Sequence, residues 1–302
     1  MTAVLTPEET ARLGETLSRV LATFDAAAAR ARDPVAFVHR FQAADDRALV
    51  GLFAALLAYG RVELIARALE DVCRRIGPTP ALSAAADALA PDEAARRFDG
   101  FVYRMTRGAD LTRLWLGVGT LYRAGRTVED AFVAADASDA PDLRPALAGL
   151  RDTLLAPTAH FPARKAFEHF FPDPRRSSAT KRLWLYLRWM VRGPDAIDLG
   201  LWTRVSPARL TMPVDTHIHR ISGYLGLTTR LPADARTAAE ITAALRTLDP
   251  TDPVRFDFAL THLGISGDCA RRRVPAICAA CALDALCRLD AEGQLSKTFR
   301  RP

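Results

Sequence analysis

The hydrophobic positions of the chain recur every three to four residues over most of its length. This spacing places apolar side chains on one face of a helix, so it predicts amphipathic helices. No run of alternating apolar and polar residues lies between turn signals, so no sheet is expected and the predicted fold class is all-α. We expect helices over residues 7–31, 45–58, 62–76, 82–98, 110–124 and 127–134, with a loop near 137–145.

A further pair of helices is predicted in the segment FPARKAFEHFFPDPRRSSATKRLWLYLRWMVRGPD. The first helix ends before Pro172, because proline removes a backbone donor and disfavours helix in the residue before it. Ser177 or Ser178 can cap the next helix, which is expected from about residue 179 to 192 and ends at a Gly-Pro pair. The pattern is that of a helix–hairpin–helix.

The segment PVDTHIHRISGYLGL, residues 213–227, begins as an extended dipeptide and continues as an apolar helix. Asp215 stands where this helix begins, and aspartate is one of the preferred N-cap residues. The helix N-terminus also favours the ionised form of a carboxylate, which suits a catalytic role. Both interpretations of Asp215 are open at this point, and they are compatible.

Four of the five cysteines lie in the segment CARRRVPAICAACALDALC. Gaps of eight, two and five residues separate Cys269, Cys278, Cys281 and Cys287. Thiolates at these spacings can bind one metal centre, either a 4Fe-4S cluster or a zinc ion, and the spacing alone does not choose between them. The alternative is four unrelated core cysteines. Cys73 stands alone in an apolar helix and is expected to be a small core residue.

The composition is that of a globular protein, because 49% of the 302 residues are hydrophobic and 25% are charged. No apolar run approaches the roughly 18 residues of a membrane span, and no signal-peptide pattern is present. A cytoplasmic protein is therefore expected, and we expect it to be a monomer. The net charge of +6 and the pI of about 9.4 favour a nucleic-acid partner. Positive charge is concentrated in residues 173–220, where nine Lys or Arg accompany four Asp.

Lysine is rare in this chain. Only Lys165, Lys181 and Lys297 are lysines among the 41 basic residues, and the other 38 are arginines. A lysine can lose its proton and act as a nucleophile, whereas arginine stays protonated. Lys181 follows the predicted hairpin turn and is therefore a candidate for chemistry.

The cysteine loop after a helical body resembles the iron–sulfur motif of endonuclease III-like DNA glycosylases, and this resemblance favours iron–sulfur over zinc. Those enzymes have gaps of six, two and five residues, so the first gap is longer here. The V-D-T-H segment resembles the same helix–hairpin–helix (HhH-GPD) superfamily. The runs SSATKRLWLYLRWMVR and LAYGR, the latter at residues 57–61, are similar to a bacterial branch described as a domain of unknown function.

The resemblance covers residues 35–290 in outline and is specific at 171–192, 213–227 and 269–287. It implies a two-lobed helical fold. Residues 1–45 would form N-terminal helices that pack with the C-terminal lobe. Residues 46–214 would form a helical lobe that contains the helix–hairpin–helix at about 163–192 and an insertion at 193–212. Residues 215–302 would form the C-terminal lobe, with the cluster loop at 269–287.

The resemblance implies base excision from double-stranded, damaged DNA. Asp215 matches the catalytic carboxylate, and Lys181 matches the lysine that attacks the sugar C1′ in members that are also abasic-site lyases. Two departures from the superfamily pattern leave open the alternative that Lys181 binds phosphate or has a structural role. Ser177, Ser178 and Ala179 stand where the superfamily has a Gly-hydrophobic-Gly turn. Lys181 also precedes Asp215 by 34 positions, against about twenty in the superfamily.

The resemblance also implies contacts with DNA. His217 would support Asp215 by hydrogen bonding, and Tyr59 with Arg61 would belong to a loop that fills the gap left by a flipped base. The basic run between the first two cysteines would meet phosphates, although a solvated surface run is the alternative. The expected DNA contacts are Arg61, Arg176, Ser177, Ser178, Arg182, His217, Arg220, Arg271, Arg272 and Arg273. The rival function is a non-catalytic helix–hairpin–helix protein that binds nucleic acid and is stabilised by an iron–sulfur or zinc site.

Overall fold

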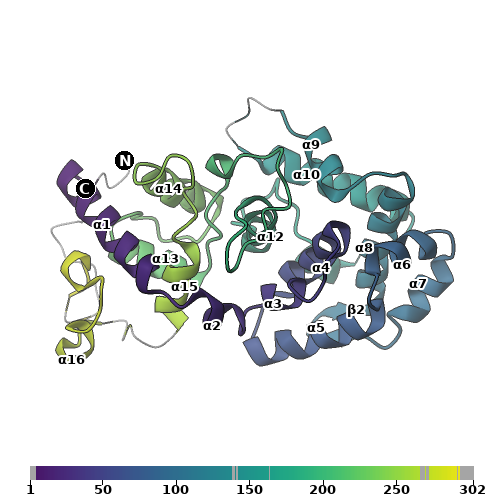
Figure 1. The fold of residues 1–302 in the computed structure, drawn as a ribbon, viewed down its shortest axis with the longest axis horizontal. Helices are drawn as coiled ribbons and strands as arrows, with labels where there is room; N and C mark the ends of the chain where they lie inside the picture. Colours follow the sequence, from purple (N-terminus) through teal and green to yellow (C-terminus); the bar gives the residue numbers. More distant parts are fainter. Residues whose placement is uncertain are drawn as a thin grey trace. The chain divides into compact units, whose positions relative to one another are not determined.

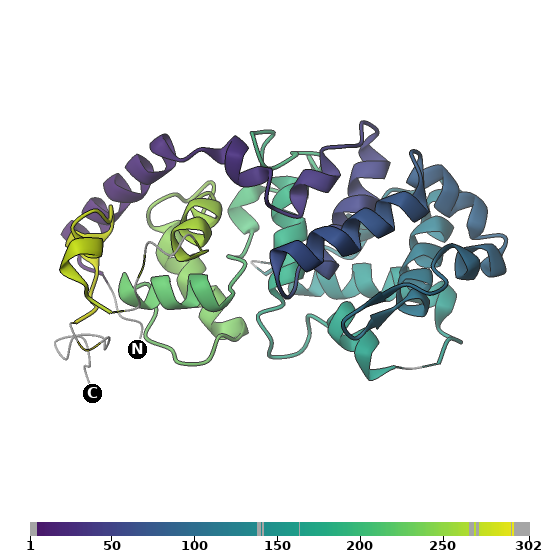
Figure 2. The same cartoon turned by 90° about the horizontal axis from the view of Figure 1, so that it is seen from below.

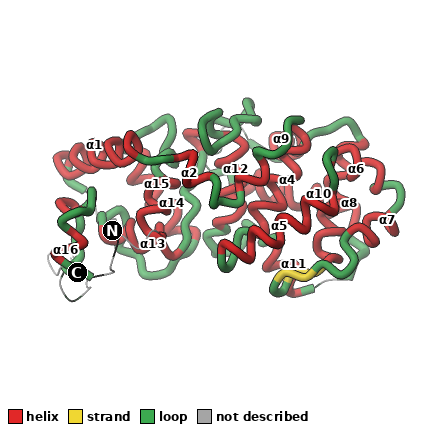
Figure 3. The backbone as a smooth tube through the Cα atoms, turned by 60° about the horizontal axis from the view of Figure 1, so that its bottom comes forward, coloured by secondary structure: helices red, strands yellow, loops and turns green. Residues whose placement is uncertain are grey.

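The computed structural model of the protein describes residues 5–137, 140, 142–162, 164–265, 269, 272–290 and 292. The described part is mostly helical, as expected for the all-α class (Figures 1 and 3). Two strands, β1 (Val102–Tyr103) and β2 (Thr106–Arg107), form an antiparallel ribbon that is visible in Figure 2. The expectation of no sheet is therefore wrong here, because a two-residue strand is too short to show an alternating pattern.

The chain divides into two compact units that share sequence in an interleaved way. The first unit contains residues 1–26, 177–184 and 206–302, and the second contains residues 27–176 and 185–205. These bounds differ from the three segments expected above, because residues 27–45 belong to the second unit and residues 177–184 of the helix–hairpin–helix belong to the first. Helix α12 (Lys181–Val191) contributes its first four residues to the first unit and the rest to the second.

The second unit contains most of the helices. Its core is built on α4, whose residues are buried almost throughout, and on α8, which buries more than half of its residues. Gly51 of α4 lets α12 approach closely, since a Cβ there would lie 2.9 Å from Met190 Cε. The helices are α2 (Ala26–Arg30, which begins in the first unit), α3 (Val35–Val38), α4 (Ala44–Leu57), α5 (Val62–Ile76), α6 (Pro80–Asp87), α7 (Pro91–Arg97), α8 (Gly108–Arg123), α9 (Val128–Ala134), α10 (Arg144–Leu155) and α11 (Lys165–Phe170), with a 3-10 turn at Ala156–Thr158.

The first unit combines the N-terminal helix with the C-terminal part of the chain. Helix α1 buries Leu13 and Leu17, and a capping box at Thr6 and Glu9 fixes its start. Helices α13 and α15 pack on one another. The helices are α1 (Pro7–Thr23), α13 (Thr216–Tyr224), α14 (Ala235–Arg246), α15 (Asp257–Ile265) and α16 (Pro275–Cys278), with 3-10 turns at Pro207–Arg209 and Asp284–Leu286.

Two of the predicted helices are broken in the structure. The helix expected over 7–31 is interrupted at Phe24 and Asp25, and the helix expected over 82–98 is divided before Pro91. Pro91 occupies the first turn of α7, where its missing N–H is tolerated, but it cannot continue α6. The helix expected over 62–76 has the same bounds in the structure.

The segment after α12 folds back on the end of that helix. The N–H groups of Leu199 and Trp202 donate to carbonyls in the last turn of α12, and the Gly200 N–H donates to the carbonyl of the residue that follows the helix, each at 2.8 Å. The ring of Trp202 contacts those of Phe132 and Tyr186. Residues 193–205 therefore satisfy carbonyls at the helix end, which would otherwise lack partners. Of the expected insertion at 193–212, residues 193–205 belong to the second unit and residues 206–212 to the first.

Candidate functional site

The structure brings Lys181 and Asp215 together within the first unit. The Lys181 ammonium Nζ donates to Asp215 Oδ2 at 2.9 Å, although 34 positions separate the two residues. The side chains are 28% and 21% exposed, so the pair is half-buried and open to solvent. A nucleophile and a base within hydrogen-bond reach are the geometric mark of nucleophilic catalysis. The wide sequence gap therefore does not prevent these two side chains from meeting.

The other oxygen of Asp215 caps α13. Asp215 Oδ1 accepts hydrogen bonds from the backbone N–H groups of His217 and Ile218 at 2.8 and 2.9 Å. Burial raises the pKa of Asp215, but the Lys181 charge and the Ile218 N–H lower it more, so the net pKa lies below its ordinary value. Asp215 is thus an N-cap and an ion-pair partner at once, and its carboxylate stays ionised at neutral pH.

The hairpin turn before α12 is fixed by the loop that precedes α14. Ser178 and Asp234 form an isolated antiparallel bridge, and the Ala235 N–H donates to the Ser177 carbonyl at 2.9 Å. Asp234 also caps α14 by accepting from the Thr237 N–H at 2.9 Å. The turn lacks glycine, and its pairing with the loop before α14 helps to fix its conformation.

Thr180 closes the turn in an unusual conformation. Its φ is +44°, in the left-handed region that costs a non-glycine residue roughly 1–2 kcal/mol and is rare for a β-branched one. Its carbonyl accepts from the Leu183 and Trp184 N–H groups at 2.9 and 3.4 Å, which begins α12. Its own N–H donates to Ser178 Oγ at 3.3 Å. Ser178 therefore supports the residue that precedes α12, whereas the expected serine cap would bind an N–H group inside the helix.

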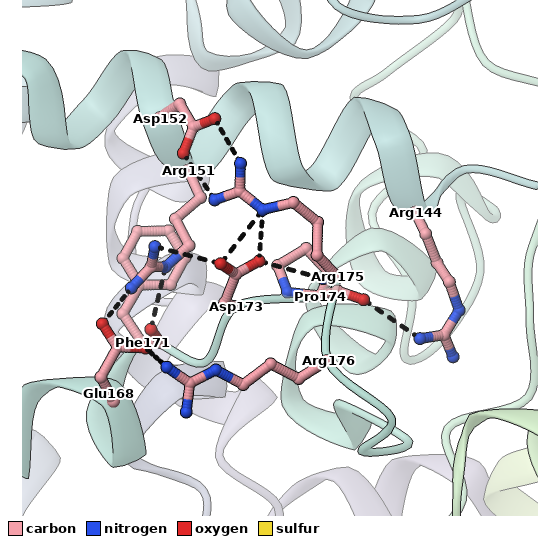
Figure 4. Close-up of polar contacts among 9 residues, drawn as sticks. All are labelled: Arg144, Arg151, Asp152, Glu168, Phe171, Asp173, Pro174, Arg175 and Arg176. Carbon is pink, nitrogen blue, oxygen red and sulfur yellow. Dashed lines mark hydrogen bonds and ion pairs between the residues drawn. The ribbon is translucent and has the colours of Figure 1, made fainter. Parts of the chain in front are cut away.

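A network of arginines and carboxylates braces the first half of the hairpin, in the second unit (Figure 4). Arg175 makes two hydrogen bonds of 3.0 Å to the Asp152 carboxylate and also binds Asp173. Arg151, which is buried, donates to Glu168 at 2.8 Å and to the Phe171 carbonyl at 3.1 Å. Arg176 is more exposed, at 69%, and lies 3.5 Å from Glu168. The positive charge of this segment is therefore largely paired.

Charge pairing continues beyond the hairpin in the second unit. Arg188 and Asp198 are 2% and 1% exposed and bind at 3.1 Å, and Arg192 binds Asp198 at 2.7 Å. Arg204 binds Asp130 at 2.6 Å. Much of the basic excess expected at residues 173–220 is thus matched by carboxylates.

The remaining expected DNA contacts differ in their settings. Ser177 and Ser178 are exposed at the turn, whereas Arg182, His217 and Arg220 are half-buried. Arg61 is 80% exposed and lies 3.6 Å from Glu63 in the second unit. Its neighbour Tyr59 is pinned to the β1–β2 ribbon, since its hydroxyl lies 2.7 Å from Thr106 Oγ1.

The four cysteines of the C-terminal loop line one small cavity. The Val274 N–H points to Cys278 Sγ at 3.4 Å, and burial raises the pKa values of the Cys281 and Cys287 thiols. Four thiols around one cavity are a suitable donor set for a metal centre. However, no group of three or more His, Cys, Asp or Glu side chains among residues that the structure describes is arranged to hold a metal ion. The ligand set therefore stays a prediction.

The arginines of this loop are not equivalent. Arg271 lies outside the described residues. Arg272 is exposed, whereas Arg273 donates to Asp284 at 2.8 Å and to the Cys287 carbonyl at 3.4 Å. Arg273 is thus engaged with the loop itself, whereas the exposed Arg272 fits both a phosphate contact and a solvated surface run.

Three structural residues had no distinctive sequence signal. Nothing in the sequence marks Thr180 as a residue with a positive φ. Asp234 is distant from the hairpin in sequence, and only the folded chain brings it to Ser178. Arg288 follows the last cysteine, and its N–H donates to the Tyr224 carbonyl at 2.8 Å while its side chain binds Glu9 at 2.9 Å. Arg288 thereby ties the cysteine loop to α13 and α1. The Asp before Ala235 could have been identified as a helix cap, but not as a partner of Ser178.

No helix in the described ranges is long and apolar enough to cross a membrane. Neither the curated proteins nor the solved structures give a match to this chain. A family model described as a protein of unknown function (DUF2400) matches residues 33–266. The matched range includes the hairpin, Lys181 and Asp215, ends before Cys269, and covers more than half of the 302 residues. The chain therefore belongs to the DUF2400 family of proteins of unknown function.

Proposed function

We propose that the protein is a two-lobed helix–hairpin–helix (HhH-GPD-type) DNA glycosylase that removes a damaged base from double-stranded DNA and also acts as an abasic-site lyase. The observation that carries the proposal is the Lys181–Asp215 pair, with 2.9 Å between Nζ and Oδ2. Its partial exposure leaves room for a sugar to approach. Such an enzyme must take the target nucleotide out of the base stack, because the glycosidic bond is otherwise out of reach.

The pair has suitable chemistry for this reaction. Departure of a base builds positive charge on the sugar, which an ionised carboxylate at Asp215 stabilises. The neutral Lys181 amine attacks C1′, so a C–N bond to lysine forms as the bond to the base breaks and the base leaves with the electron pair. The C1′ ammonium then loses a proton, and Asp215 is within reach to accept it. The C1′–O4′ bond opens next, so that O4′ leaves with the electron pair and takes up a proton while the nitrogen lone pair forms the Schiff base. Loss of a C2′ proton from the Schiff base then eliminates the 3′ phosphate, which is the lyase step.

Other residues would bind the DNA backbone. Arg61, Arg176 and Arg272 have exposed side chains suited to phosphate, and the turn at Ser177 and Ser178 offers hydroxyls and amides. We assign Arg182, His217 and Arg220 to contacts near the reacting sugar because they share the first unit with Lys181 and Asp215. Arg271 is included on sequence alone, and Arg273 is assigned to support of the cysteine loop.

We infer a 4Fe-4S cluster as the cofactor, held by Cys269, Cys278, Cys281 and Cys287, with zinc as the alternative. All four cysteines line one cavity, which supports this assignment. The proposed role is to shape the loop that carries the arginines. No step of the reaction passes through the metal centre.

A non-catalytic nucleic-acid-binding protein is the second candidate. It is favoured by the glycine-free hairpin and by the carboxylates that neutralise Arg175 and Arg188. Such a protein would bind duplexes and release no base, so one experiment separates the two candidates.

The test is a screen of duplexes that carry oxidised, alkylated, deaminated or abasic sites, with base release and strand cleavage as readouts. We expect the wild-type protein to release a base from at least one of them, and Asp215→Asn to lose this activity but keep DNA binding. Asp249→Asn is the matched control, because Asp249 is another ion-paired carboxylate of the first unit. Equal turnover by Asp215→Asn and wild type would contradict the assignment. Binding of every duplex without cleavage by wild type would favour the second candidate.

A further inference from the structure

Thr180 combines three features that are unusual in one residue. Its backbone is left-handed at φ +44°, the residue is only 4% exposed, and its buried Oγ1 has no hydrogen-bond partner. A β-branched residue disfavours this conformation, and a buried hydroxyl without a partner is also unfavourable. Strain of this kind persists only where the surroundings enforce it, and it is concentrated at functional sites.

The surroundings of Thr180 are well fixed on both sides. Before it, Ser178 is bridged to Asp234, which is itself bound to Arg230 at 2.9 Å and to the start of α14. After it, the Thr180 carbonyl begins α12 by accepting from Leu183 and Trp184. The backbone direction at Thr180 therefore determines how the first turn of α12 leaves the hairpin.

We propose that Thr180 is a positioning residue whose buried, β-branched side chain and left-handed backbone aim Lys181 at Asp215. Lys181 is the next residue and the first of α12, so a rotation at Thr180 would move its Cα and side chain together. Asp215 is fixed independently by its two bonds to the start of α13, so the direction of Lys181 is the adjustable half of the pair. This inference deepens the proposed function, and the effect of Thr180 on catalysis rests on that function.

The shape of the Thr180 side chain does the positioning, because its hydroxyl has no partner to hold it. Thr180→Val keeps the branched shape and should preserve the pair. Thr180→Gly removes the shape and lets the backbone sample other conformations, since glycine populates positive and negative φ about equally. Thr180→Ala removes the shape but retains a Cβ, so it is a second variant if the glycine variant does not fold.

The scarcity of lysine permits a direct measurement that does not depend on DNA. The chain has three lysines, and Lys165 is exposed on α11, where it serves as an internal reference. Acetylation of each lysine in the full-length protein is followed by mass spectrometry. Pairing with a carboxylate favours the charged, unreactive amine. We expect Lys181 to react about tenfold more slowly than Lys165 in the wild type, and the difference to vanish in Asp215→Asn, which removes the partner.

For Thr180→Gly and Thr180→Ala we expect the reaction of Lys181 to accelerate about threefold or more relative to Lys165, and for Thr180→Val to stay within about twofold of the wild type. On abasic DNA, Thr180→Gly should form the lysine adduct more slowly at saturating DNA, with unchanged DNA affinity. A folded Thr180→Gly variant with the wild-type reactivity ratio would overturn the proposal. If the wild type forms no adduct and releases no base, the proposed function fails, whereas the reactivity ratio still decides the role of Thr180.

Discussion

The two oxygens of the Asp215 carboxylate serve different partners, one at the start of α13 and one on Lys181. An N-cap needs only an oxygen acceptor, whereas an ion pair needs the negative charge. Replacement of Asp215 by Asn or by Ala therefore separates the two roles, because asparagine caps helices about as well as aspartate and alanine does not cap them.

We expect Asp215→Asn to lower the free energy of unfolding at pH 7 by about 1 kcal/mol or less, the usual value of a half-exposed pair. Asp215→Ala should cost roughly 0.5–2 kcal/mol more, because the cap is also lost. Urea denaturation measures both. Equal stabilities of the two variants would mean that the cap contributes nothing.

The same pair has a defined pH dependence. Since the pKa of Asp215 is lowered below 3.8 in the folded protein, its charge stabilises the fold above that value, and this contribution is lost as the pH falls through the folded pKa. The stability difference between wild type and Asp215→Asn should thus be constant from pH 7 to about 5 and shrink below about 4. A difference that grew on acidification would have the wrong sign.

Sequence reasoning reached Asp215 and Lys181 but not the contact between them. An Asp before an apolar helix is recognisable as a cap, and a rare lysine after a hairpin is recognisable as a candidate nucleophile. The 2.9 Å contact depends on how the chain returns after residues 193–212, which no local pattern encodes. The left-handed backbone of Thr180 was equally unpredictable from sequence, because threonine disfavours the conformation that it adopts.

Helix α12 depends on the segment that follows it. Residues 199–202 satisfy its last carbonyls, and Asp198 neutralises the buried Arg188. The Asp198 carboxylate compensates the charge of Arg188, so the helix carries no net buried charge from this pair. The segment therefore stabilises the helix that presents Lys181 without adding charge.

We expect Asp198→Asn to be strongly destabilising, by about 3–5 kcal/mol, because it leaves a buried arginine poorly paired. Asp152→Asn is the control, since its pair with Arg175 has both side chains 53% exposed and should be worth less than about 1 kcal/mol. Urea midpoints of the two variants give the comparison. Similar losses in both variants would show that burial of the Arg188 pair does not matter.

Helix boundaries were predictable where apolar periodicity and punctuation agree. The helix at Val62–Ile76 ends at a glycine with φ +76°, and the sequence locates it fully. The helix expected over 7–31 breaks at Phe24 and Asp25, where no proline or glycine marks the break. Tertiary packing decides such positions, because Phe24 packs its ring on Phe258 from a distant part of the chain.

The two compact units are interleaved in sequence, and the chain passes between them at residues 26, 176, 184 and 205. The sequence does not mark the points where the chain changes from one unit to the other. One of them, after residue 184, lies inside the continuous helix α12. The net charge of +6 likewise says less than its distribution, because many arginines near the hairpin are paired.

The metal bound by the cysteine loop is identified on the purified, full-length protein. We expect anaerobic purification to yield a brown protein with broad visible absorbance and about four irons per chain, as for a 4Fe-4S cluster. Substitution of Cys278 by Ala should abolish the colour, whereas Cys73→Ala should not. A colourless protein with stoichiometric zinc would falsify the iron–sulfur assignment and leave the fold unaffected.

The most direct test of the central claim is borohydride trapping on a duplex with an abasic site, followed by mass spectrometry of the adduct. Lys181, Lys165 and Lys297 are the only lysines, so the site of attachment is unambiguous. We predict a covalent adduct on Lys181 in the wild type, a much lower yield in Asp215→Asn, and no adduct in Lys181→Gln. An adduct that persists in Lys181→Gln, or no adduct on DNA that the protein cleaves, would contradict the account.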